Sequence, residues 1–231
     1  MPLFLAARDL AEGVINVCMD ELDNSFARAE RIYIEADALV AVGDFTAAIA
    51  RYDEVINLLP YSAVAFYDRG LAHQKMGDFD CAILDYTEAI QRNPHDADSF
   101  NNRGLAFASL GQYDNALTDY AEAIRLAPHD AKAFHNRGLT LSTLGDDEQA
   151  VVDYSIAIKL NPKDAPVIYN RGVSYANLSS FADAIQDFTR SLQFDADSFM
   201  WRGRLFKAIG RTDEARADFE EAERLRSIAD T

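Results

Sequence analysis

The chain has 231 residues, of which 49% are hydrophobic and 26% charged, a composition typical of a soluble protein with a packed core. Its formal net charge of −16 at pH 7 disfavours binding to nucleic acid or to an anionic membrane surface, because such binding needs clustered Lys and Arg. No apolar run approaches the ~20 residues of a membrane helix, and no basic region precedes the first apolar patch, so we expect no membrane insertion and no export signal. Cys18 and Cys81 alone cannot form a disulfide framework or a zinc quartet, so a cytoplasmic, reducing environment is expected.

Residues 1–28 form the first predicted element, an N-terminal helical segment. Apolar residues recur there at helical spacing and would share one face, namely Leu3, Ala7, Leu10, Val14 and Val17. We interpret the segment as a helix that covers the start of the next element. The alternative is a helix that docks in a groove of its own chain or of a neighbouring copy.

From residue 29 the chain repeats itself with a step of 34 residues. The step is seen most directly in the prolines Pro60, Pro94, Pro128 and Pro162. It is also seen in the Arg-Gly pairs that contain Gly70, Gly104, Gly138 and Gly172. These residues divide the repeat array at 29–231 into repeats at 29–62, 63–96, 97–130, 131–164, 165–195 and 196–229.

Each repeat is predicted to contain two helices joined by a tight turn. A glycine at position 15 of the unit can adopt the left-handed conformation that ends the first helix, as at Gly43, Gly77, Gly111, Gly145 and Gly210. An aspartate such as Asp78 then caps the second helix. The fifth unit has Ser179 at this position, so we expect that residue to be held in the left-handed region. Small residues at positions 8 and 20 allow the two helices to approach closely.

This pattern resembles the tetratricopeptide repeat family, which carries Gly at position 8, Ala at 20, an aromatic residue at 24, Ala at 27 and Pro at 32. The resemblance covers residues 29–229 and implies an all-α fold. The expected architecture is a right-handed α-solenoid of about six helix–turn–helix repeats with an extra N-terminal helix. No unit can bury its apolar face alone, so stacking of neighbouring units would form the core.

Two charged positions vary together within the repeat. Arg at position 7 accompanies Asp at position 23 in the later units, whereas the first unit has Glu35 and Arg51 with the charges exchanged. This exchange predicts an ion pair between the two helices of a unit. The arginines are therefore interpreted as structural, and not as a site for phosphate or acidic peptides.

The resemblance also implies that positions 5, 6 and 9 line a concave groove that binds peptides. The residues there are Tyr67 and Tyr169 at position 5, Asp68, Asn102, Asn136 and Asn170 at position 6, and Leu71, Leu105, Leu139 and Val173 at position 9. In some family members, asparagines at position 6 grip a peptide backbone, since an amide both donates and accepts hydrogen bonds. The alternative is an ordinary solvated helix face. The leucines would form an exposed apolar strip if the family geometry holds.

No phosphate loop, nucleophile elbow, zinc spacing or glycine-rich dinucleotide turn is present in the sequence. We therefore expect no enzymatic activity, no cofactor and no metal site. The predicted function is a protein–protein interaction adaptor whose concave groove binds a peptide or helix of a partner protein. The alternative is a structural scaffold that self-assembles into a homo-oligomer through the N-terminal helix or the terminal repeats.

Overall fold

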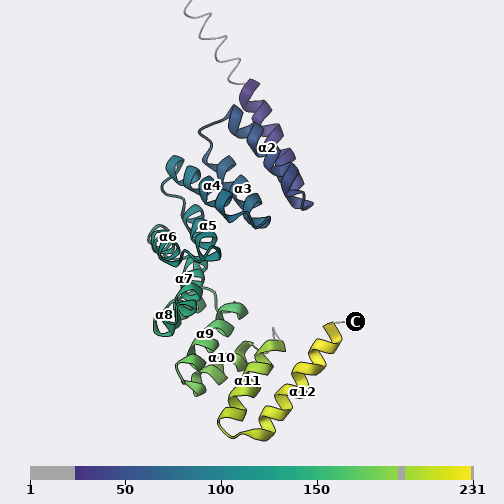
Figure 1. Ribbon diagram of the computed structural model, residues 1–231, viewed down its shortest axis with the longest axis vertical. Coiled ribbons are helices and arrows are strands. Elements are labelled where there is room, and N and C mark those ends of the chain that lie inside the picture. The colour runs from purple at the N-terminus through teal and green to yellow at the C-terminus, as the bar shows by residue number, and fades with distance from the viewer. Residues whose placement is uncertain (1–23, 192–195, 230–231) are drawn as a thin grey trace, which may run out of the picture. The chain divides into compact units, whose positions relative to one another are not determined.

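The computed structural model of the protein describes residues 24–191 and 196–229, which form helices joined by short turns (Figure 1). The predicted helical face from Leu3 to Val17 lies outside these residues. The chain divides into two compact units, one up to Leu110 and one from Gly111 onward. No helix within the described ranges is both long and apolar enough to cross a membrane.

The first unit consists of a helix over residues 24–41 followed by α2 (Phe45–Leu58), α3 (Ala63–Lys75), α4 (Phe79–Arg92) and α5 (Ala97–Ser109). The helix over 24–41 runs through residue 29 without a break, so residues 24–28 continue the first helix of the first repeat. The predicted boundary between an N-terminal segment and the array therefore does not coincide with the end of a helix.

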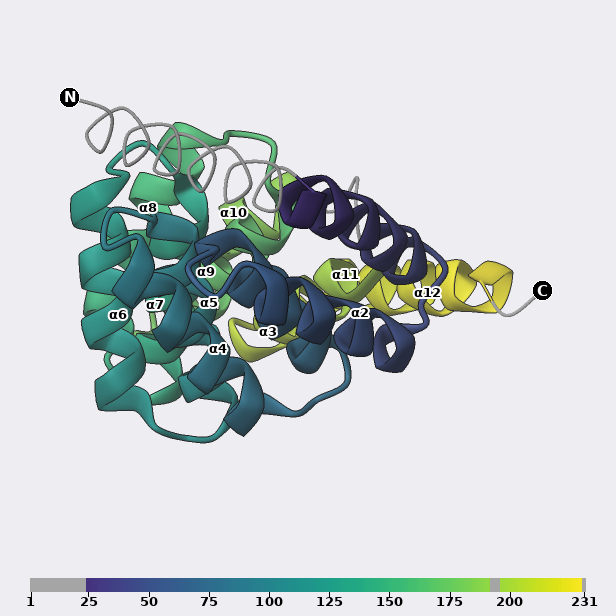
Figure 2. The same cartoon turned by 90° about the horizontal axis from the view of Figure 1, so that it is seen from above.

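The second unit consists of α6 (Tyr113–Leu126), α7 (Ala131–Thr143), α8 (Asp147–Leu160), α9 (Ala165–Asn177), α10 (Phe181–Ser191), α11 (Ala196–Ala208) and α12 (Thr212–Ala229). Within each unit consecutive helices pack against each other, and α11 and α12 lie side by side in both views (Figures 1 and 2). The all-α architecture of stacked helix pairs is thus confirmed.

The turns inside the repeats have the backbone that the sequence predicts. Gly77 has φ of +80° and Gly145 has φ of +84°, both in the left-handed region. Ser179 also adopts this conformation, with φ of 60°, as expected from its place at the turn of the fifth repeat. The second helix then begins with a side-chain cap, as where Asp78 accepts a hydrogen bond from the Cys81 backbone N–H.

In the second and fourth repeats, position 8 of the first helix lies close to the aromatic ring at position 24 of the second helix. A Cβ atom added to Gly138 would lie 2.9 Å from the ring of Tyr154, and one added to Gly70 would lie 2.9 Å from the ring of Tyr86. Both tyrosines are fully buried. At these two positions a larger residue would push against the ring, whereas the first repeat packs Ala36 with Tyr52 at the equivalent positions.

The predicted ion pairs are present between the two helices of a repeat. Arg137 donates from Nε and Nη2 to the two carboxylate oxygens of Asp153 at 2.7 and 2.8 Å. The same two-bond geometry joins Arg69 to Asp85, Arg171 to Asp187 and Arg202 to Asp218. The exchanged pair of the first repeat is also formed, although Arg51 Nε lies 3.9 Å from Glu35.

In some repeats the third guanidinium nitrogen of the position-7 arginine forms a hydrogen bond to the preceding repeat, which we call the inter-repeat latch. Nη1 of Arg103 donates to the Thr87 hydroxyl at 3.0 Å, and Nη1 of Arg171 donates to Ser155 at 3.0 Å. In both cases the acceptor is position 25 of the preceding repeat. The equivalent residue before Arg137 is Ala121, whose side chain has no acceptor atom. The inter-repeat latch is therefore absent between Ala121 and Arg137.

Candidate functional site

The residues predicted to line a groove lie on the first helix of successive repeats, as expected. The first unit contains Tyr67, Asp68 and Leu71 on α3 with Asn102 and Leu105 on α5. The second unit contains Asn136 and Leu139 on α7 with Tyr169, Asn170 and Val173 on α9. The two sets belong to separate units and form two candidate surfaces.

In the first unit, position 5 of one repeat is hydrogen-bonded to position 6 of the next. Tyr33 donates its hydroxyl hydrogen to Asp68, and Asn102 donates from Nδ2 to the Tyr67 hydroxyl at 2.9 Å. The Tyr67 ring also packs against the buried ring of Tyr86, with centroids 5.9 Å apart. These contacts fix the orientation of the polar groups along the surface.

The second unit repeats this arrangement with a histidine in place of tyrosine. Nδ2 of Asn170 lies 3.1 Å from Nε2 of His135, and the His135 ring packs near Tyr154 at 6.1 Å between centroids. Burial lowers the pKa of His135, although the nearby carboxylate of Asp164 opposes this shift. The imidazole is therefore neutral at pH 7, and Nε2 can accept the amide hydrogen.

Asn102 and Asn170 thus have a structural role that the sequence alone did not reveal. Asn102 uses one amide hydrogen for Tyr67, and its Oδ1 lies 3.4 Å from Nδ2 of Asn101. An amide can form up to four hydrogen bonds, so capacity for a bound backbone remains after these contacts. Because the bonds within the protein hold the amide in place, a partner would meet a pre-oriented group.

The predicted apolar strip is exposed mainly at one position. The Leu139 residue is 44% exposed, whereas Leu71, Leu105 and Val173 are half-buried. Leu71 packs against the cluster around Tyr86 and Ala106. Their tight packing limits the apolar area that α3, α5 and α9 can offer to a partner.

A cavity of about 330 Å³ opens in the first unit beside the predicted residues. It lies between the helix over 24–41, α3 and the turn that precedes α5. Its lining residues are Tyr33, Ala63, Val64, Tyr67, Asp68, Asn93, Asp96 and Asp98. We call this cavity the acidic pocket, because its described lining contains three aspartates and neither lysine nor arginine.

The aspartates of the acidic pocket affect the titration of the groups around them. Burial, followed by the charges of Asp98 and Asp96, raises the pKa of Tyr67 to about 12. Burial is also the main cause that raises the pKa of Asp68, and the charge of Asp37 adds to it. The charges of the neighbouring aspartates contribute to both shifts and make a further negative charge at the site unfavourable.

Of the residues that line the acidic pocket, only Tyr67 and Asp68 are among those predicted from the sequence. Asp96 is the N-cap of α5 and accepts a hydrogen bond from the Ser99 N–H, which makes it resemble any other cap. Tyr33 occupies position 5 in the first repeat and is equivalent to Tyr67 in the second. This equivalence could have placed Tyr33 on the candidate surface. Asp98 recurs as Asp197 and Asn93 recurs as Asn161, but neither recurrence identifies a binding residue.

A second cavity, of about 360 Å³, lies in the second unit between α11 and α12. Its lining mixes basic, acidic and apolar side chains, namely Lys207, Thr212, Ala215, Arg216, Phe219, Glu220 and Glu223. All of these residues except Lys207 lie on α12, the last described helix. The cavity is a candidate contact site for a second protein or a second copy.

Models of the tetratricopeptide repeat match most of the array. Two models described as tetratricopeptide repeat match residues 67–131 and residues 131–164 with 196–227, and one described as TPR repeat matches residues 36–77. No curated protein sequence matches the chain.

Solved structures with the same fold cover most of the chain. The pilF protein of Pseudomonas aeruginosa is 20% identical, with a TM-score of 0.75 over 89% of this chain and 93% of that chain. A MamA fragment from Desulfovibrio magneticus RS-1 is 19% identical, with a TM-score of 0.67 over 71% of this chain and 93% of that one. YrrB, a repeat protein with an unusual peptide-binding site, is 23% identical, with a TM-score of 0.60 over 72% and 86%.

Proposed function

Because the chain belongs to the tetratricopeptide repeat family, we propose that it is a non-catalytic adaptor that binds a peptide or helix of a partner protein. The fold suggests a role in protein–protein interaction, as an adaptor or a scaffold, and proteins of this family are generally non-catalytic. YrrB shares the fold and has a peptide-binding site. The observation that supports the proposal most directly is the acidic pocket beside the hydrogen-bonded row of Tyr33, Asp68, Tyr67 and Asn102.

The chemistry of the acidic pocket favours a partner segment with a basic side chain. A lysine or arginine entering the pocket would meet the carboxylates of Asp68, Asp96 and Asp98. Hydrogen bonds between ionised groups are stronger than neutral ones, and the rings of Tyr33 and Tyr67 would add cation–π attraction. The amide of Asn102 would bind the backbone of the same segment.

The second unit offers a related surface without such a pocket. Asn136 and Asn170 would bind backbone there, and the exposed Leu139 would contact an apolar side chain. We propose that this surface adds affinity for partners with an apolar residue, while the acidic pocket selects for positive charge.

Binding of synthetic peptides would test the proposal. We suggest fluorescein-labelled peptides of equal length with a central Lys, Arg, Glu or Leu, measured by fluorescence anisotropy at low salt. The Lys and Arg peptides should bind at least tenfold more tightly than the Glu peptide. The double change Asp68→Asn with Asp98→Asn should remove most of that preference, since it neutralises two pocket carboxylates and retains their shape.

A matched control separates the pocket from the general charge of the protein. Asp114→Asn with Asp213→Asn also removes two negative charges, at exposed first-turn positions of α6 and α12. If this control reduces the preference for basic peptides as much as the pocket variant does, the pocket is not the binding site. Equal affinity of all four peptides for the parent would overturn the proposal itself.

The alternative is a scaffold that self-assembles, which the cavity between α11 and α12 favours. Light scattering after size exclusion should then show an oligomer that persists on dilution and dissociates after Glu220→Lys with Glu223→Lys. Removal of residues 1–23 tests the N-terminal segment without cutting into the helix over 24–41. A monomer at all concentrations would exclude the scaffold.

A further inference from the structure

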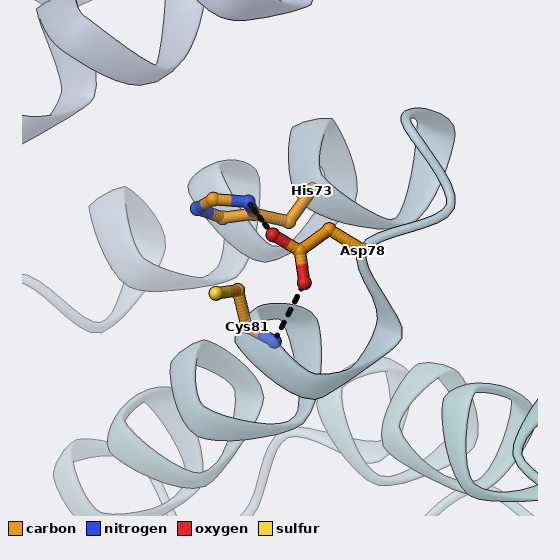
Figure 3. Close-up of side chains that lie close together, drawn as sticks. All are labelled: His73, Asp78 and Cys81. Carbon is orange, nitrogen blue, oxygen red and sulfur yellow. Dashed lines mark hydrogen bonds and ion pairs between the residues drawn. The ribbon is translucent and has the colours of Figure 1, made fainter.

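His73, Asp78 and Cys81 lie together where α3 ends and α4 begins (Figure 3). His73 Nδ1 is 3.5 Å from Asp78 Oδ2, and Asp78 Oδ1 accepts the Cys81 backbone N–H at 3.3 Å. One side-chain donor atom from each residue falls within 4.8 Å of the other two. The ring, the carboxylate and the sulfur all face the same space (Figure 3).

Comparison with the other repeats shows that this cluster is particular to the second repeat. His73 occupies position 11, where the other repeats have Leu39, Phe107, Leu141, Tyr175 and Phe206. Cys81 occupies position 19, where the others have Ala47, Asn115, Gln149, Asp183 and Glu214. The only imidazole and the only thiol at these two positions of the repeats therefore occur in the same repeat and lie next to each other.

A carboxylate lies near the far side of the His73 ring, although beyond hydrogen-bond distance. Its Nε2 lies 4.0 Å from Asp85 Oδ2, and Asp85 is itself held by two hydrogen bonds from Arg69. Metal-bound histidines commonly direct their other ring nitrogen to a carboxylate, which fixes the tautomer and the ring orientation. Here a small rotation of the ring toward Asp85 would form that hydrogen bond, with Nδ1 still facing Asp78 and Cys81.

We propose that His73 Nδ1, Asp78 Oδ2 and Cys81 Sγ form a three-ligand site for Zn²⁺ or a similar divalent transition-metal ion. Thiolate and imidazole are ligands that zinc prefers, whereas Ca²⁺ and Mg²⁺ need mainly oxygen ligands. Tetrahedral bonds of about 2.0 to 2.3 Å place ligand atoms roughly 3 to 4 Å apart, so small side-chain rotations close the site. The thiol proton is released to solvent on binding, and a fourth position stays open for water.

The site is accessible and would strengthen the second repeat. Asp78 is exposed and Cys81 half-buried, so an ion can enter from solvent, while the His73 side chain is only 18% exposed. Bound metal would join the end of α3 to the start of α4 across the turn at Gly77. Asp78 Oδ1 would keep its capping bond, since Oδ2 is the oxygen directed to His73.

Cobalt binding provides a spectroscopic test with the full-length chain. The reduced, chelator-treated protein is titrated with Co²⁺, which gives a thiolate charge-transfer band and strong visible bands when coordination is tetrahedral. Cys81→Ala and His73→Leu introduce residues that other repeats already have at these positions, so both variants should fold. Each should lose the bands and weaken Zn²⁺ binding at least tenfold in competition with a chelating dye.

Two controls assign the signal to this site. Asp78→Asn and Asp146→Asn each remove the charge from an equivalent helix cap. Only Asp78→Asn should lower the affinity for the metal ion. Cys18→Ser should retain the charge-transfer band. The proposal is overturned if the parent gives no such band in excess Co²⁺, or if Cys81→Ala keeps it. Equal losses in the two aspartate variants would also overturn it, because the effect would then come from capping.

Discussion

Removing one member of the ion pair between Arg137 and Asp153 should destabilise the second unit, and removing both should recover part of the loss. The Asp153 side chain is 4% exposed and that of Arg137 is 28% exposed. Breaking a fully buried pair costs about 3–5 kcal/mol, whereas exposed pairs contribute about 0–1 kcal/mol. Since the guanidinium is partly solvated, we expect Asp153→Asn to cost about 2 kcal/mol.

A double-mutant cycle with Arg137→Gln would isolate the pair. Arg137 suits this measurement because the side chain of Ala121 cannot accept a hydrogen bond from it. The measured coupling energy therefore does not include the loss of an inter-repeat latch. Urea unfolding followed by far-ultraviolet circular dichroism should give a coupling energy of about 1–2 kcal/mol.

The exchanged pair of the first repeat serves as the matched control. Glu35 and Arg51 are 3.9 Å apart, with side chains 54% and 43% exposed, so their cycle should give less than about 0.5 kcal/mol. A coupling between Arg137 and Asp153 no larger than this value would refute the assignment of stability to the buried, two-bond geometry.

Three further changes probe the turn, the core and a buried histidine. Ser179→Gly should raise the free energy of unfolding by about 1 kcal/mol in urea, since a residue with a side chain is strained at its φ of 60°. Gly138→Ala should lower the melting temperature, because the new methyl would meet the Tyr154 ring at 2.9 Å and cost about 1–3 kcal/mol. Burial lowers the pKa of His135, so the folded protein binds fewer protons than the unfolded chain and loses stability as pH falls below about 6.5. His135→Tyr should make the free energy of unfolding less dependent on pH in this range.

Each of these expectations has a result that would contradict it. An unchanged or lower stability of the Ser179→Gly variant would mean that the turn is not strained. A Gly138→Ala variant as stable as the parent would show that the ring can move away, so that close approach is not required. If the parent and the His135→Tyr variant lose the same stability between pH 7 and pH 5, another group is responsible.

The fold could be predicted because most of its determinants lie within one repeat. The determinants are the glycine turn, the capping aspartate and the exchange of Glu35 with Arg51. Each involves only residues of two helices that follow each other closely in the chain. Ser179 was identified by the same logic, since it stands where the other turns have glycine. Such contacts recur with the repeat and can be read by alignment of the chain with itself.

The candidate surface was predicted less completely because it depends on how repeats stack. The bond from Asn102 to Tyr67 joins two repeats, whereas the sequence predicts for this asparagine either contact with a partner or a solvated helix face. Leu71 was expected in an exposed strip, but its burial depends on the neighbouring cluster around Tyr86. The cluster of His73 and Cys81 was missed because its ligand spacing matches no common zinc pattern.

The missing inter-repeat latch at Ala121 bears on how unfolding would spread through the second unit. Stability in a stacked array is approximately a sum of repeat energies and nearest-neighbour couplings. The contact between α6 and α7 lacks a hydrogen bond that similar contacts have, typically about 0.5–1.5 kcal/mol. Cooperativity should therefore fail first at this contact, so that amide hydrogens of α6 exchange with solvent while those of α7 to α10 remain protected.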